Sequence, residues 1–316
     1  MYSGKVSADS PPETDPFAFL RRSELEVVRG SDPPTLARRF ADLGPEVLVD
    51  GRWRLKTSLG RGGFGVVYEA ASETGDSAPM ALKLIAPESD PDTWWTRRFE
   101  QEADVAMGLH HPNIVRTFER GQLEDGTRYL VMELLEGESL RDRLSARVGL
   151  PWDQVAAIAE QLGGALGRVH ARGIVHRDIK PSNLFIVGTA ETMERAVLID
   201  FGLCKGPSAI TASREQLGTR PYLAPEMLVQ DARHATSAVD VYGLAVLSYE
   251  TVTGRRAFAE VPTGDAPPPL ASLRADVPEG LTELIGLGMS PRPHERPRDV
   301  AAYGNAIART IRLAGP

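Results

Sequence analysis

The chain has 316 residues, of which 42% are hydrophobic and 25% are charged, and this composition excludes a fully disordered, collagen-like or disulfide-scaffold protein. Acidic residues outnumber basic ones by 43 to 36, for a formal net charge of −7, which argues against a general nucleic-acid binder. The single cysteine, Cys204, excludes an internal disulfide and a cysteine-based zinc site.

The first 50 residues differ in composition from the rest. Residues 1–16 are rich in Ser, Pro, Asp and Gly, which is typical of a disordered segment. A helix start at Asp32 is followed by Leu36, Phe40 and Leu43 at helical spacing, which predicts one short helix. We therefore predict an N-terminal extension over 1–50, either packed on the main domain or used as a docking or regulatory segment.

Strand patterns dominate the next part of the chain. Alternating or β-branched runs predict four strands, near residues 53–57, 66–70, 80–85 and 129–135. Residues 94–109 carry the apolar spacing of a helix. Together these elements predict a small antiparallel sheet with one main helix, which we assign to an N-lobe over 51–132.

Helices dominate from about residue 137 onward. Apolar periodicity predicts four of them, over 155–169, 239–253, 281–289 and 300–311. The prolines between 262 and 278 predict an extended segment. The expected fold is α+β and bilobal, with a C-lobe over 133–312, and a cleft between two lobes is a usual place for a small-molecule site.

No segment has the pattern of a membrane span or a signal peptide. The longest apolar run in the second half, 241–249, is far shorter than the ~20 residues that cross a bilayer. The polar N-terminus lacks the apolar core of a signal peptide. We predict a cytoplasmic protein with no membrane partner and no nucleic-acid partner.

A glycine-rich turn and a lysine stand in the predicted sheet. Residues 60–65 (GRGGFG) lie between two strands, so backbone amides there can approach phosphate oxygens without obstruction, although a plain glycine hairpin has the same pattern. Lys83 suits a phosphate because its ammonium is a compact point charge. Glu102, on the predicted helix, is the best-placed carboxylate to hold it, although most glutamates lie on solvated helix faces.

The densest cluster of reactive groups is residues 176–183 (HRDIKPSN). Asp178 can accept a hydrogen bond from an incoming hydroxyl, and Lys180 can balance charge on a phosphoryl group in flight. Asn183 can ligate a metal through its carbonyl oxygen. Asp200 ends an apolar strand and suits magnesium, although an Asp-x-Gly turn also ends many strands without a ligand.

Taken in chain order, these motifs resemble the protein kinase signature, and most closely that of bacterial Hanks-type serine/threonine kinases. The motifs stand in the order that the family has: the glycine-rich turn at 60–65, Lys83, Glu102, the HRD loop at 176–178, DFG at 200–202 and APE at 224–226. The resemblance extends from about residue 53 to 311. It implies the bilobal kinase fold, with ATP and Mg²⁺ or Mn²⁺ as cofactors.

The resemblance also implies a role for individual positions. The catalytic residues would be Lys83, Glu102, Asp178 and Lys180, with Asn183 and Asp200 as metal ligands. Nucleotide binding would fall to Gly60, Gly62, Gly65, Val67, Ala81, Lys83, Glu133 and Leu135, with Met132 as gatekeeper. Glu226 would pair with Arg296, and Asp240 would anchor the catalytic loop.

The resemblance implies that proteins bearing Ser or Thr are the substrates. Lys180 and residues 218–222 (GTRPY) are typical of the serine/threonine type. Arg177, before the catalytic aspartate, implies regulation by activation-loop phosphorylation. Thr211 and Ser213 have the spacing of autophosphorylation sites in bacterial relatives, many of which activate as homodimers.

Alternative functions and one departure from the family remain. A kinase-fold scaffold or pseudokinase would lack the lysine or a metal ligand, and none is missing. A small-molecule phosphotransferase is disfavoured by the APE motif and the segment before it. After Phe258, residues 259–265 are too short and proline-interrupted for the usual helix, which leaves substrate docking open. Cys204 is better interpreted as an inert thiol than as a redox switch.

Overall fold

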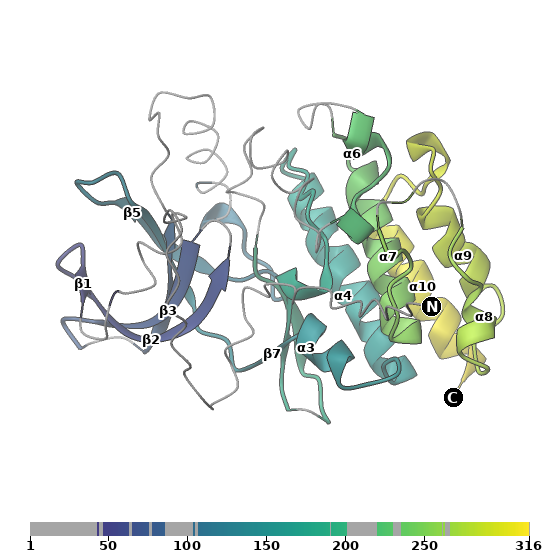
Figure 1. Cartoon of the computed structure of the whole chain (residues 1–316), viewed down its shortest axis with the longest axis horizontal. Helices are drawn as coiled ribbons and strands as arrows, with labels where there is room; N and C mark the ends of the chain where they lie inside the picture. Colours follow the sequence, from purple (N-terminus) through teal and green to yellow (C-terminus); the bar gives the residue numbers. More distant parts are fainter. Residues whose placement is uncertain are drawn as a thin grey trace, which may run out of the picture.

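The structure, a computed structural model, describes residues 43, 47–62, 65–75, 78–85, 104, 107–189, 191–200, 220–229, 235–260, 262 and 266–315. An antiparallel sheet forms one end of the molecule and a group of helices forms the other (Figure 1). This arrangement confirms the predicted α+β, bilobal fold.

The N-lobe sheet has six antiparallel strands in the order β1-β2-β3-β4-β6-β5. They are β1 (Leu48–Val49), β2 (Trp53–Gly62), β3 (Gly65–Ser72), β4 (Met80–Ile85), β5 (Thr117–Gln122) and β6 (Arg128–Glu133). Four of them coincide with the predicted strand runs. Strands β1 and β5 were not predicted, and β1 lies before residue 51, the predicted start of the domain.

The C-lobe combines helices with a three-stranded sheet at its junction with the N-lobe (Figure 1). Its helices are α3 (Leu140–Ser145), α4 (Trp152–His170), α6 (Glu226–Val229), α7 (Ala238–Thr253), α8 (Leu270–Leu273), α9 (Leu281–Gly288) and α10 (Val300–Ala314). The 3-10 helices η1 (Pro181–Asn183), η2 (Arg220–Tyr222) and η4 (Pro293–Glu295) lie between them. The sheet pairs β7 (Gly137–Ser139), β8 (Leu184–Val187) and β9 (Arg195–Leu198).

The N-lobe sheet buries apolar side chains on both faces, since neighbouring residues in a strand point to opposite sides. One face carries Tyr68 and Leu82, which belong to a core made mostly by the N-lobe itself. The other carries Val67 and Met132, which share a second core with Val169 of α4. This second core holds the two lobes together.

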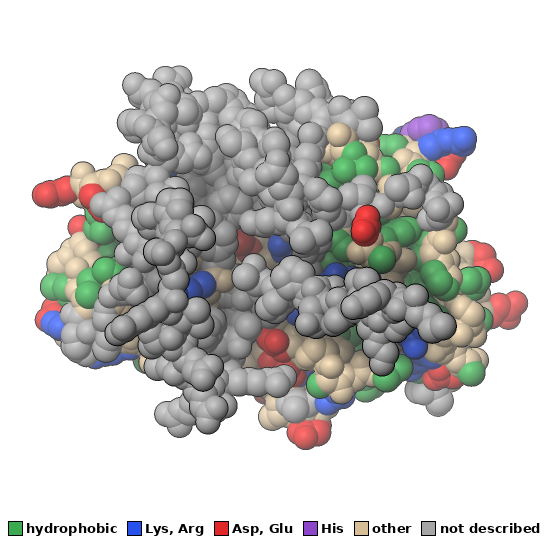
Figure 2. Space-filling model, viewed as in Figure 1, with side chains coloured by type: hydrophobic (Ala, Val, Ile, Leu, Met, Phe, Trp, Pro, Cys, Tyr) green, Lys and Arg blue, Asp and Glu red, His purple; other side chains and the backbone are tan. Residues whose placement is uncertain are grey.

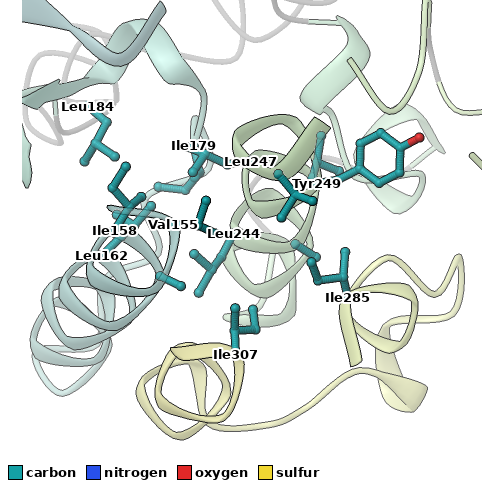
Figure 3. Packing of buried hydrophobic residues seen from close by; sticks show 14 of the residues in the cluster. Val155, Ile158, Leu162, Ile179, Leu184, Leu244, Leu247, Tyr249, Ile285 and Ile307 are labelled. Carbon is teal, nitrogen blue, oxygen red and sulfur yellow. The ribbon is translucent and has the colours of Figure 1, made fainter. Parts of the chain in front are cut away.

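Helix α7 is the centre of the C-lobe. Every residue from 239 to 253 is buried, which confirms the helix predicted to be apolar on nearly all sides. Leu244 and Leu247 lie between Ile158 of α4 and Ile285 of α9 (Figure 3). A polar side chain on this helix therefore needs a partner in the interior.

Charged side chains lie mainly on the outside. Among the described residues that are coloured on the face drawn in Figure 2, acidic and basic groups are scattered rather than gathered in one patch. Within the described ranges, no helix is both long enough and apolar enough to span a bilayer.

Some sequence expectations fall outside the described residues, and one was wrong. Of the helix predicted over 94–109, Asp104, Met107 and Gly108 are helical and Leu109 is not. The helix predicted from 32 lies outside the described residues except for Leu43, which is not helical. The segment 262–278 was predicted to be extended, yet it contains α8. Pro269 precedes that helix with φ −56°, and a proline's fixed φ suits a helix start.

Helices α4 and α10 cross closely because glycines face one another. A Cβ on Gly163 of α4 would lie 3.0 Å from the Cα of Gly304. A Cβ on Gly304 of α10 would overlap the carbonyl oxygen of Ala159. The backbones fill this crossing, so it has no space for a side chain.

We expect Gly304→Ala to lower the free energy of unfolding by about 1–3 kcal/mol, because the methyl group must push two backbones apart. Urea unfolding followed by circular dichroism measures the change. The matched control is Gly286→Ala in α9, where an added Cβ meets nothing within 4 Å and alanine's helix propensity adds up to about 1 kcal/mol. Equal stability changes in the two variants would contradict the interpretation of the crossing.

Candidate active site

The loop 176–183 is fastened to the buried helix α7 by one carboxylate. Asp240 is 0% exposed, and its two oxygens accept hydrogen bonds from the backbone N–H groups of His176 and Arg177, each at 2.8 Å. Its Oδ2 also lies 2.7 Å from Nε2 of His170. Arg177 has φ +67°, and the two backbone bonds hold it in that uncommon conformation.

Asp178 follows this anchor and is held from its other side by Asn183. The Nδ2 of Asn183 donates to both the carbonyl oxygen and the Oδ2 of Asp178, each at 2.8 Å. The Nζ of Lys180 lies 3.4 Å from the same Oδ2. Asp178 and Asn183 are buried, so the carboxylate has a fixed direction with a cation beside it.

Asp200 is brought to this loop by the β8–β9 hairpin. Strand β8 begins directly after Asn183, and Leu184 pairs with Leu198. The backbone N–H of Ile199 then donates to the carbonyl oxygen of Asn183 at 3.1 Å. Asn183 and Asp200, 17 residues apart in sequence, therefore lie side by side at the end of one small sheet.

Lys83 reaches the same place from the N-lobe. Its Nζ lies 3.0 Å from the Oδ1 of Asp200, and the lysine side chain is 15% exposed. Lys83 stands on β4, opposite Val67 of β3. Glu102, its predicted partner, lies outside the described residues. In this structure a C-lobe carboxylate contacts the lysine, and the pair connects the two lobes.

An apolar pocket lies beside these charges, between the lobes. It is lined by Leu59, Val67, Ala81, Val115, Met132, Glu133, Leu134, Leu135, Phe185 and Ile199. These residues come from β2, β3, β4, β6 and β8 and from the chain before β5, and Ile199 directly precedes Asp200. A flat apolar group bound here would present attached polar groups to Lys83 and Asp200.

The sequence predicted four of the residues that line this pocket as nucleotide-binding, namely Val67, Ala81, Glu133 and Leu135, with Met132 as gatekeeper. It did not single out Leu59, Val115, Leu134, Phe185 or Ile199. Phe185 could have been predicted to line the pocket, because it comes two residues after Asn183 in sequence. Val115 could not, since its position depends on hydrogen bonds to residues distant in sequence.

The predicted glycines lie on the hairpin of β2 and β3. Gly60 pairs with Val67, and Gly62 pairs with Gly65. A Cβ on Gly65 would overlap the carbonyl oxygen of Leu84 on β4, so close strand packing also requires glycine there. Leu59 and Val67 of these two strands line the pocket, and glycine has no side chain that would obstruct the approach of a bound group to the backbone.

Asn183 and Asp200 fit a cation of the magnesium type, which takes most of its ligands from phosphate and water, better than a metal that is held by protein side chains alone. The amide of Asn183 uses its nitrogen for both bonds to Asp178, which leaves its oxygen as the atom suited to a metal. The described residues contain no group of three or more His, Cys, Asp or Glu that could hold a metal. Two hard oxygen ligands, completed by phosphate and water, are how Mg²⁺ is usually bound.

A second set of buried charges supports the segment that follows the site. The Nη1 and Nη2 atoms of Arg296 donate to the two oxygens of Glu226 at 2.6 and 2.7 Å, and the Arg296 side chain is 0% exposed. Arg296 also donates to the carbonyl oxygens of Ala238 and Ser290. This is the pair that the resemblance implied, and it ties the APE motif to α7.

Sequence reasoning missed a neighbouring cluster around Tyr222. The Tyr222 hydroxyl donates to Oε2 of Glu250 at 2.6 Å, and Arg141 of α3 contacts both the hydroxyl and, at 2.7 Å, the Oε1 of Glu250. Burial and the Glu250 carboxylate raise the pKa of Tyr222 far above its usual range. Glu250, a charged residue within the mostly apolar run of α7, was the available signal.

Comparisons with known proteins identify the family that this chain resembles. A family model described as "Protein kinase domain" matches residues 53–266. The chain is 34% identical over 280 residues to the serine/threonine-protein kinase PknA of Mycobacterium tuberculosis, covering 83% of this chain and 62% of PknA. It is 34% identical over 257 residues to PknD of the same organism, covering 78% of this chain and 38% of PknD.

Solved structures show the same fold. The kinase domain of M. tuberculosis PknI superposes with a TM-score of 0.70 at 26% identity, covering 85% of this chain and 98% of that domain. The chain thus covers nearly all of a solved kinase domain, but it spans only about three-fifths of the length of PknA.

We expect Asp240→Asn to lower the free energy of unfolding by about 2–4 kcal/mol, because the amide presents an N–H group where a buried carboxylate accepts hydrogen bonds. Hydrogen exchange at residues 174–180 should accelerate with it. The control is Asp276→Asn, the same chemical change at a side chain that is 63% exposed, where about 1 kcal/mol or less is expected. Unchanged exchange in the loop would show that Asp240 does not anchor it.

Proposed function

The chain belongs to the bacterial Hanks-type serine/threonine protein kinases, and from that membership we propose that it transfers the γ-phosphoryl group of ATP to Ser and Thr hydroxyls of proteins. One observation carries the proposal. Lys83 of β4, Asp178 and Asn183 of the loop 176–183, and Asp200 just after β9 converge beside an apolar pocket between two lobes. A scaffold without phosphotransfer is not favoured, since each of these residues is present.

We propose that the apolar pocket takes the adenine ring. Val67 and Ala81 would contact one face of the ring, and Phe185 lies on the C-lobe side. The backbone of Glu133 and Leu135 would supply hydrogen bonds to the ring edge. The backbone of Gly60, Gly62 and Gly65 would then cover the phosphates from the β2–β3 hairpin.

Lys83 would act on the phosphates as a point charge. In the structure its ammonium contacts Asp200 at 3.0 Å, so its charge already lies at the end of the pocket. With ATP bound, Lys83 would contact the α- and β-phosphates and pair with Glu102. Asp200 would then turn from the lysine to the metal.

Asp178 would orient the substrate hydroxyl and accept its proton as the oxygen attacks the γ-phosphorus. Its direction is already fixed, because Asn183 holds its Oδ2 and its carbonyl oxygen. Lys180, 3.4 Å from Oδ2, would balance the negative charge on the phosphoryl group in flight. Catalysis would consist mainly of such positioning and charge stabilisation.

Mg²⁺ or Mn²⁺, held by Asn183 and Asp200, would neutralise phosphate charge when bound. Among the described residues, Asn183 and Asp200 are the two oxygen ligands that we assign at the end of β8–β9, and we propose that the metal enters with the nucleotide. Mg²⁺ commonly binds in this way, through one or two protein oxygens plus phosphates.

The remaining assignments are also proposals. We propose an extension over 1–50, a kinase domain over 51–312 and protein substrates bearing Ser or Thr. The protein would work in the cytoplasm without nucleic-acid or membrane partners and would pair with a second copy for activation. Thr211 and Ser213, the proposed autophosphorylation sites, and Cys204 lie outside the described residues.

We expect Asp178→Asn to lower phosphotransfer by about 10²–10⁴-fold, because the amide cannot accept the hydroxyl proton. Radiolabelled ATP with a generic protein substrate measures the rate. ATP affinity should change little, since Asp178 does not line the adenine pocket. The control is Asp153→Asn at an exposed position of α4, and equal rates in Asp178→Asn and wild type would remove the proposed mechanism.

We expect the double variant Thr211→Ala with Ser213→Ala to lose the phosphopeptides that wild type forms with ATP and Mg²⁺, and to lose activity with them, because Arg177 then has no phosphate to pair with. Phosphopeptide mapping by mass spectrometry measures this. The Asp178→Asn chain is the control, since it keeps both hydroxyls but should stay unphosphorylated when incubated alone. Identical maps for the double variant and wild type would reject these sites.

A further inference from the structure

The chain passes between the lobes at two places that lie side by side. One is the residue Arg116, just before β5, and the other begins at Glu133, the last residue of β6. The backbone N–H of Glu133 donates to the carbonyl oxygen of Arg116 at 2.9 Å. In return, the backbone N–H of Arg116 donates to Oε1 of Glu133 at 2.9 Å. The two crossings therefore move together.

The chain just before the first crossing is fixed to the C-lobe. The backbone N–H of Leu198 donates to the carbonyl oxygen of Asn113, and the backbone N–H of Val115 donates to that of Leu198, both at 2.9 Å. The Nδ2 of Asn113 also donates to the carbonyl oxygen of Ala196 at 2.9 Å. Residues 113–115 thus extend the C-lobe sheet, whereas Thr117 already pairs with β6 in the N-lobe.

One guanidinium of the C-lobe contacts both the second crossing and the chain that leads to the first. Arg195, the first residue of β9, donates from Nη2 to Oε2 of Glu133 at 3.0 Å. Its Nη1 donates to the carbonyl oxygen of Pro112 at 2.8 Å. Both carboxylate oxygens of Glu133 are then used, one by Arg116 and the other by Arg195. The Arg195 and Glu133 side chains are 34% and 23% exposed.

We propose that Arg195 is a positioning residue for the nucleotide and that it acts through Glu133. Glu133 lines the pocket, as do Leu134 and Leu135, which follow it in the second crossing. We call residues 133–135 the hinge. A carboxylate held on both oxygens fixes the backbone of Glu133, to which the edge of the adenine ring would bind. This inference rests on the proposed function, because it assigns Arg195 to the ATP pocket of that function.

We expect the Arg195–Glu133 ion pair to affect nucleotide affinity more than the stability of the fold. A partly exposed ion pair contributes little to global stability. The Arg195–Glu133 pair joins elements of different lobes, however, so lobe movement stretches it directly. Without it, the hinge samples more conformations, and the nucleotide must restrict them when it binds, which weakens affinity.

Binding of a fluorescent ADP analogue and steady-state kinetics with ATP test the proposal in the full chain. For Arg195→Ala we expect the Kd for ADP and the KM for ATP each to rise about three- to fivefold, the range that one such ion pair supplies. ADP should dissociate faster by the same factor, and kcat should not fall in parallel. Arg195→Lys, which keeps the charge, should recover part of the affinity.

The control is Arg312→Ala, which removes an exposed ion pair of 2.5 Å between α10 and Glu160 of α4 within the C-lobe. It should match Arg195→Ala in melting temperature while keeping wild-type nucleotide constants. Glu133→Gln keeps an acceptor for Arg116 but loses the charge that faces Arg195. It should reproduce the Arg195→Ala effect, and adding Arg195→Ala to it should weaken binding no further. If Arg195→Ala fails to fold, Glu133→Gln carries the same test.

Wild-type nucleotide constants in Arg195→Ala, or an equal change in Arg312→Ala, would overturn the role of Arg195 while leaving the kinase function intact. A wild-type chain that binds ADP but transfers no phosphate would instead overturn the proposed function. The binding measurement would then still decide whether Arg195 positions the hinge, and a wild-type chain that binds no nucleotide would overturn both.

Discussion

The buried carboxylate of Asp240 is the interaction on which the site depends. A charge at 0% exposure is costly unless its oxygens are bonded, and here the bonds come from the backbone of His176 and Arg177 and from the His170 ring. Because α7 is packed on all sides, Asp240 has a fixed position and holds these partners in place. The loop that carries Asp178 is therefore fixed relative to the C-lobe core.

A connected series of contacts joins this loop to the boundary between the lobes. Asn183 bonds Asp178, Ile199 bonds Asn183, and Asp200 follows Ile199 and contacts Lys83 of the N-lobe. Every C-lobe member is placed by backbone pairing in the β8–β9 hairpin or by a buried side chain. Lys83 is the exception, since it approaches on a long flexible side chain, and in the proposed function it is the group whose partner would change when a phosphate binds.

The main features could be predicted from the sequence where the local sequence pattern matches the environment of the residues in the folded structure. The alternation at the start of β2, the β-type runs of β3 and β4 and the mostly apolar run of α7 are local signals, and the residues of 176–183 and Asp200 follow the kinase signature. Strand β1 has two residues, too short for any period, and α8 was hidden by the prolines around it. The Arg195–Glu133 and Arg141–Glu250 pairs were missed because nothing local distinguishes a surface arginine from one that bridges two elements.

The strong and the weak ion pairs of this protein have different places in the fold. Arg296–Glu226 and Asp240 with its donors are buried inside the C-lobe, where breaking a pair leaves an unsolvated charge and costs stability. Lys83–Asp200 and Arg195–Glu133 are partly exposed and connect one lobe to the other. Water can replace such contacts at little cost, so the lobes can move while each lobe stays folded. The proposed function, in which the site admits ATP and releases ADP, requires this distribution, with fixed catalytic groups on the C-lobe and adjustable contacts between the lobes.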